Sequence, residues 1–177
     1  MAAGVMLLGT ISNAGAIGAS PGILPTYKPL KYRLPFSIAT SNIVKLPKTS
    51  SIAADEDCWA VHPGVNPRWE GKGGGGDTLY TIDFYLAWCT PKDKSRITRW
   101  FDRNCWGHPR FEGVTFDSCN VWTGSAGYKQ APLQVDWTLH ATYECGQERP
   151  CSSWYTPWVE GTVHANPPSV TGTVYFD

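Results

Sequence analysis

Apolar and polar side chains alternate along two long segments of the chain. From Leu133 to Cys145 every second residue is apolar or cysteine, without a break. A period of two is typical of a β-strand with one buried and one solvent-exposed face. The segment from Thr78 to Cys89 has the same period, with aliphatic and aromatic residues on one face. Both segments are therefore predicted to be antiparallel strands.

Shorter strand patterns fill most of the remaining C-terminal two thirds. They lie at 58–62, 96–102, 110–117, 119–123, 152–163 and 169–176. Turn-forming residues separate them, at 73–76, 91, 107, 124–127 and 167–168. No segment keeps a helical period, and only 92–103 has room for a short helix. Roughly eight short strands at this spacing predict an all-β fold, an antiparallel β-sandwich or barrel.

A proline-rich, basic segment precedes this region. Residues 20–57 hold five prolines, which exclude a long helix. Within this arm, residues 30–38 alternate as a strand does, and Pro35 removes a backbone donor, which is tolerated at a sheet edge. Two interpretations stay open: an edge strand of the same domain, or an extended arm that adds to the sheet of a partner. We expect the disulfide-bonded β domain to cover 58–177.

The first 19 residues have the composition of a secretory signal peptide. Residues 1–27 carry no charged side chain, and an apolar run begins at Val5. Ala14 and Ala16 provide the small-x-small pattern of a cleavage site, although the usual basic start is missing. A membrane anchor is the alternative, but small and polar residues interrupt the stretch before about 20 continuous apolar residues. We predict a cleaved signal, a secreted protein and no stable membrane span.

All six cysteines fall in one window of the chain: Cys58, Cys89, Cys105, Cys119, Cys145 and Cys151. Paired cysteines persist in oxidising compartments, so this count agrees with secretion. The sequence does not fix the pairing, but the turn-like residues between the last two favour a local bridge, and sequential pairing is our hypothesis. The chain has no C-x-x-C motif, and the spacings fit no zinc template. We expect neither a metal nor another cofactor.

The charge is balanced overall but unevenly distributed. A formal net charge of zero argues against nucleic acid as the main partner. Residues 1–54 nevertheless carry five of the 15 Lys and Arg residues and no acid. The glycine run 73–76 lacks the lysine of a phosphate-binding loop and precedes a strand, so it is predicted to be a hairpin tip.

Basic and aromatic residues interleave between positions 92 and 111. Arginine and tryptophan are the residue types that anchor interfaces, and they also pair through cation–π contacts. Together with two aromatic residues of the arm, they form the predicted binding set: Arg96, Arg99, Trp100, Arg103, Trp106, Arg110, Tyr32 and Phe36. The alternative is an ordinary solvated strand face whose aromatic residues are buried beneath it.

Nothing in the sequence points to a catalytic site. The four histidines lie in turns or on polar strand faces, and 124–127 does not match the nucleophile elbow G-x-S-x-G. Acids such as Asp83, Asp136 and Glu144 sit on strands, as in any β protein, so facing carboxylates are not indicated. We therefore expect a non-catalytic protein.

Three functions are open, in order of preference. The first is a module that docks onto other secreted or surface proteins, as a subunit of an extracellular assembly such as a toxin or surface particle. The second is a carbohydrate- or cell-wall-binding module with an aromatic platform, for which the candidates are Trp69, Trp122, Trp154, Tyr155 and Trp158. The third is a small secreted hydrolase.

Overall fold

The computed structural model describes residues 28–61, 68–145 and 150–176. The signal-like segment 1–19 and the start of the arm, 20–27, lie outside the described residues. The described chain forms eleven β-strands, one short 3-10 helix (η1, Thr40–Asn42) and no α-helix. All strand pairs are antiparallel. The predicted all-β, antiparallel fold is confirmed.

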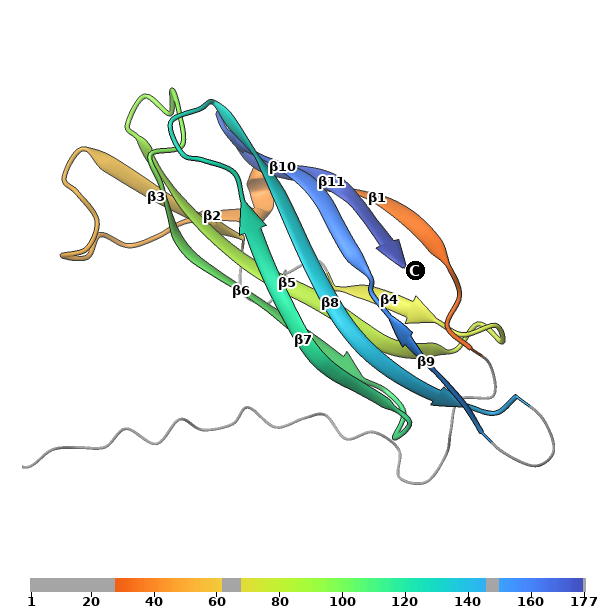
Figure 1. Cartoon of the computed structure of the whole chain (residues 1–177). Helices are drawn as coiled ribbons and strands as arrows, with labels where there is room; N and C mark the ends of the chain where they lie inside the picture. Colours follow the sequence, from red (N-terminus) through yellow and green to blue (C-terminus); the bar gives the residue numbers. More distant parts are fainter. Residues whose placement is uncertain (1–27, 62–67, 146–149, 177) are drawn as a thin grey trace, which may run out of the picture.

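The strands form two sheets that pack face to face as two layers (Figure 1). The six-stranded sheet has the order β1 (Tyr32–Ile38), β11 (Pro168–Phe176), β10 (Trp158–Ala165), β8 (Gln130–Tyr143), β7 (Val114–Thr123), and β9 (Cys151–Tyr155) also pairs with β8. The five-stranded sheet has the order β2 (Ile43–Lys45), β3 (Glu56–Val61), β5 (Thr78–Pro91), β4 (Trp69–Lys72), and β6 (Arg99–Pro109) also pairs with β5.

The number and bounds of the strands differ from the roughly eight short ones expected. Pro157 has no backbone N–H, and the expected strand 152–163 divides beside it into β9 and β10. The patterns at 110–117 and 119–123 are instead one strand, β7, because a bulge between Phe116 and Ser118 restores the pairing with β8. The expected strand 96–102 begins only at Arg99, after a turn in which Lys94 has a φ of 53°.

The described part of the basic arm is built into both sheets. β1 pairs with β11 along its whole length, from Tyr32 opposite Phe176 to Ile38 opposite Val170. β2 pairs with β3, and the expected boundary between 57 and 58 falls inside β3. The edge strand considered within 30–38 is therefore β1, at the edge of the six-stranded sheet.

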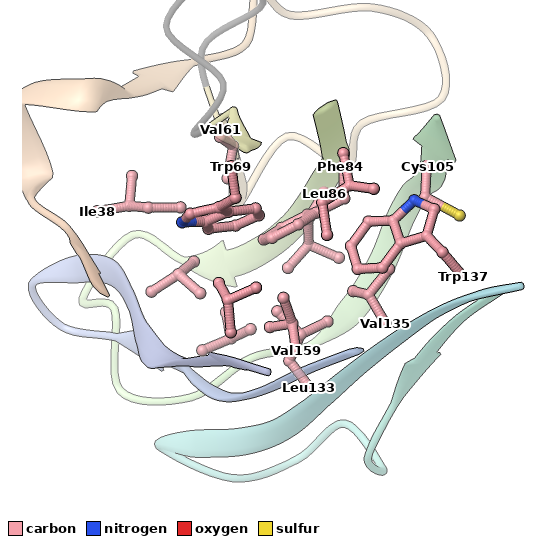
Figure 2. Packing of buried hydrophobic residues seen from close by; sticks show 14 of the residues in the cluster. Ile38, Val61, Trp69, Phe84, Leu86, Cys105, Leu133, Val135, Trp137 and Val159 are labelled. Carbon is pink, nitrogen blue, oxygen red and sulfur yellow. The ribbon is translucent and has the colours of Figure 1, made fainter. Parts of the chain in front are cut away.

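The core lies between the two inner faces and is rich in aromatic rings (Figure 2). Trp137 and Val135 of β8 are fully buried opposite Phe84 and Leu86 of β5. Trp69 of β4 packs between two further rings. The alternation of β8 thus places its apolar residues inside and its polar residues on the outer face of the sheet.

Three disulfides support the sandwich, and their connectivity is the sequential one. Cys58–Cys89 joins β3 to β5, Cys105–Cys119 joins β6 to β7, and Cys145–Cys151 joins the end of β8 to β9. The second of these links edge strands of the two sheets. Three such bridges agree with an oxidising compartment, and secretion itself stays a prediction.

The two outer faces of the sandwich differ in how well they are covered. On the five-stranded sheet, Ile52 from the segment after β2 is buried against Cys58 and Cys89. Even the outward-facing Thr81 and Asp83 of β5 are buried. On the six-stranded sheet, the outward residues of β8 from Gln130 to His140 are all exposed or half-buried, and only the inward residues between them are buried. The described residues therefore leave the six-stranded sheet with an accessible outer face.

Candidate functional site

The predicted Arg/Trp set is engaged largely by the protein itself. Arg99 Nε lies 3.1 Å from Glu56 Oε2, and its Nη2 donates to the Ser51 carbonyl at 2.6 Å. The Trp100 indole is half-buried and donates to the Gly124 carbonyl at 2.8 Å. These three interactions fix the side chains on β6 against neighbouring segments.

The other four members of the set lie further along β6 and its flanking turns. Arg103 donates to Thr123 Oγ1 at 2.8 Å, and Arg110 is half-buried. Arg96 is exposed, and Trp106 is 40% exposed. From Arg99 to Trp106 the strand rises by about 23 Å, so the set is spread along β6 and its flanks. Its role in docking stays a prediction.

The two aromatic residues of the arm face the sandwich interior. The Tyr32 ring stacks on Phe176 with centroids 4.4 Å apart, and its hydroxyl donates to the Glu70 carbonyl. Burial of this hydroxyl raises its pKa above the usual value. The Phe36 ring packs edge-on against Trp69 at 5.0 Å. In this structure both rings attach β1 to the fold.

A charged cluster lies on the outer face of the five-stranded sheet. Asp83 is buried, and its Oδ2 lies 3.3 Å from His108 Nε2 and 3.4 Å from Arg68 Nη2. A carboxylate between an arginine and a histidine is a common structural arrangement. Among the described residues, no three histidine, cysteine or acidic side chains gather to hold a metal ion.

Aromatic and polar side chains gather on the outer face of the six-stranded sheet. β8 forms the middle of this face through its outward residues Gln134, Asp136, Thr138 and His140. Directly opposite residues of paired strands share a face, so the register places Trp122 of β7 beside Gln134. By the same rule Trp158 of β10 lies beside Asp136, and Trp154 of β9 lies beside His140. We call this set of residues the outer-face track.

One end of the outer-face track is a groove of about 390 Å³. Trp122, which is 62% exposed, forms one wall on β7. The rest of the lining comes from β7, β8 and β10 and from the turn after β7: Thr123, Gly124, Pro132, Leu133, Gln134, Glu160 and Gly161. The groove thus combines an accessible indole with an amide and a carboxylate that point away from the core.

Two carboxylates, Glu160 in the groove and Asp136 next to it, make this part of the track acidic. Gln134 Nε2 donates to both carboxylate oxygens of Asp136, at 3.0 and 3.2 Å. The Trp158 indole donates to Glu160 Oε1 at 3.3 Å. No lysine, arginine or histidine of the described residues forms an ion pair with either carboxylate. Both carboxylates keep lone pairs available to a ligand's hydroxyl or amine donors.

The other two tryptophans of the track, Trp158 and Trp154, each contact a second ring. Trp158 stacks on Tyr175 of β11, with centroids 4.6 Å apart and planes 8° apart. This stacking covers one face of the half-buried Trp158 ring, so a ligand can contact only its other face. At the far end Trp154 is 63% exposed and packs against His140 with centroids 5.1 Å apart.

Of the five aromatic residues predicted to form a platform, three lie on the outer face and two lie in the core. Trp122, Trp154 and Trp158 lie on the outer face, as a platform requires. Trp69 and Tyr155 are only 8% and 9% exposed and belong to the core, so they are not platform residues. Tyr175, Gln134 and Glu160 were not among the candidates. Each of them occupies a solvent-facing position in a predicted alternating strand, and this position in the alternation could have identified them from the sequence.

No protein-family model, curated protein or solved structure matches the chain. The described residues contain no helix of the length and apolarity needed to cross a membrane.

Proposed function

We propose that this protein is a non-catalytic carbohydrate-binding module, and that a sugar binds in the groove beside Trp122. The observation that carries the proposal is the strongly exposed Trp122 indole beside Gln134 and Glu160 on a rigid sheet. An indole covers the apolar C–H surface of a sugar ring, while amide and carboxylate groups bind its hydroxyls. The proposal takes up the second of the three functions considered from the sequence.

The charge of the groove narrows the class of sugar. Asp136 and Glu160 form no ion pair within the described residues, so the outer-face track presents two unpaired carboxylates next to the groove. These two carboxylates would repel an anionic group of a ligand that bound beside them. The proposed ligand is therefore a neutral or amine-bearing glycan, not a sulfated or uronic-acid polymer.

The contribution of Trp122 can be worked out from its exposure. A tryptophan buries up to about 250 Å², so 62% exposure leaves roughly 150 Å² accessible. A sugar stacked on one ring face would cover about half of that, roughly 75 Å². At about 25 cal/mol per Å² this burial is worth about 2 kcal/mol, or roughly 30-fold in Kd.

The test is a glycan array printed with neutral, amine-bearing and sulfated oligosaccharides. The wild-type protein should bind neutral or amine-bearing glycans, and Trp122→Ala should weaken that binding by roughly 30-fold without altering the fold. Trp106→Ala is the matched control, because it removes an exposed indole from the five-stranded sheet. Binding only to sulfated glycans, binding to no glycan, or equal losses in both variants would contradict the proposal.

Docking onto other secreted proteins through the Arg/Trp set stays a prediction. Trp106→Ala tests it in parallel, because that indole is the most exposed aromatic side chain of the set. Loss of a protein partner in Trp106→Ala but not in Trp122→Ala would support docking through β6.

A further inference from the structure

Trp154 provides a second exposed indole on the same face, far from the groove. It lies on β9 opposite His140, whereas Trp122 lies on β7 opposite Gln134. Six residues of β8 separate these two positions, which corresponds to about 20 Å along the strand. β7 and β9 flank β8 on opposite edges, which adds about 9.5 Å across the sheet. The two indoles are therefore about 22 Å apart, which is further than a single sugar ring spans.

The residues between the two indoles form a continuous polar surface. Asp136, Thr138 and His140 follow one another on the outward side of β8. The half-buried Trp158 lies beside Asp136, between the two ends. Each interval therefore offers hydrogen-bonding groups next to an aromatic ring, which is the combination that the groove itself offers.

We propose that the ligand is a linear oligosaccharide that lies diagonally across β8, from Trp122 past Trp158 to Trp154. This inference rests on the proposed function and adds the ligand's class and length. Strands of one sheet hold the three rings at fixed spacing, so a chain that reaches Trp154 gains a contact without further ordering of the protein. Trp154 is thus a residue that selects long chains over short ones.

The experiment is an isothermal calorimetric titration with cello-, xylo- and chito-oligosaccharides of one to six units. For the series that binds, Kd should fall as the chain lengthens until the chain reaches Trp154. Trp154 is 63% exposed, so the burial estimate made for Trp122 applies to it too: Trp154→Ala should weaken the hexamer roughly 30-fold. It should leave the dimer unchanged, because the dimer is held at the groove. Trp122→Ala should weaken both.

The outcomes separate this inference from the proposed function. If dimers bind but the hexamer binds no more tightly, or if Trp154→Ala leaves the hexamer's Kd unchanged, the extended track is wrong and the groove stands. If no oligosaccharide of any length binds the wild-type protein, both are wrong. Circular dichroism of each variant checks that the sandwich is intact, as expected for side chains that are more than half exposed.

Discussion

Phe36→Ala tests whether β1 is an integral strand of the sandwich. Its half-buried ring packs against Trp69 at 5.0 Å. In register, Phe36 lies opposite Gly172, and a side chain added there would overlap the Phe36 ring. Gly161 pairs with Gly172 on the next strand, so the ring covers a space that two glycines leave open. Truncation would open that space to the core.

The cost of this truncation follows from the burial of the ring. Phe→Ala in a closed core costs about 3–5 kcal/mol. Because Phe36 is half-buried, the corresponding loss is about 2 kcal/mol, and the edge-on ring pair adds up to about 1 kcal/mol. A total of about 2–3 kcal/mol in a chain of this size lowers Tm by roughly 5–10 °C. Leu34→Ala, 41% exposed on the same strand, should cost under about 1 kcal/mol.

The stability of both variants is measured by urea unfolding with the disulfides intact, with tryptophan fluorescence as the signal. A clearly lower midpoint for Phe36→Ala than for Leu34→Ala is expected, with an unchanged slope. Equal midpoints for both variants and the wild type would refute the packing argument and favour a free arm over an integral β1.

Three further outcomes are expected from the same unfolding assay. Replacing Cys105 and Cys119 together by serine should destabilise the protein by about 3 kcal/mol, since their bridge closes a loop with a sequence separation of 14; no change would contradict a stabilising bridge between the sheets. Gly172→Ala should cost about 1–3 kcal/mol because the added carbon overlaps β10 backbone, and wild-type stability would show that β10 and β11 are not so closely apposed. Lys45 Nζ lies 2.8 Å from Asp57 Oδ2 and holds the pKa of that carboxyl below its usual value, so its stabilisation is present above about pH 4 and lost as pH falls through the lowered pKa. Lys45→Met should reduce this acid-dependent part, while Lys48, 3.9 Å from the same carboxylate, keeps some of it, and an unchanged pH profile would contradict the role of Lys45.

The main strands could be predicted because their patterns are local. The alternation from Leu133 to Cys145 alone identifies β8 and the face that it buries. The same rule misjudges β5, whose outward Asp83 is buried although its pattern leaves that face polar. Coverage of that sheet involves residues distant in sequence, such as Ile52 over the Cys58–Cys89 bridge, and no local pattern contains such a contact.

The candidate site was less accessible to sequence reasoning for the same physical reason. Trp122 and Trp69 were both candidates for the aromatic platform, yet one is exposed and the other is held between Phe36 and Phe84. Which ring faces solvent depends on which sheet each strand joins. The outer-face track exists only once β7, β9 and β10 are in register on β8, and that register comes from pairings distant in sequence.

The central claim is that a saccharide binds the outer face of the six-stranded sheet. Two-dimensional NMR of the 15N-labelled protein resolves the indole N–H groups of its nine tryptophans, and titration with a bound oligosaccharide reports which of them contact it. We expect the signals of Trp122 and Trp158 to shift, and those of the buried Trp88 and of Trp106 on the other sheet to stay in place. Shifts confined to Trp106, or no indole shift at saturating ligand, would contradict the central claim.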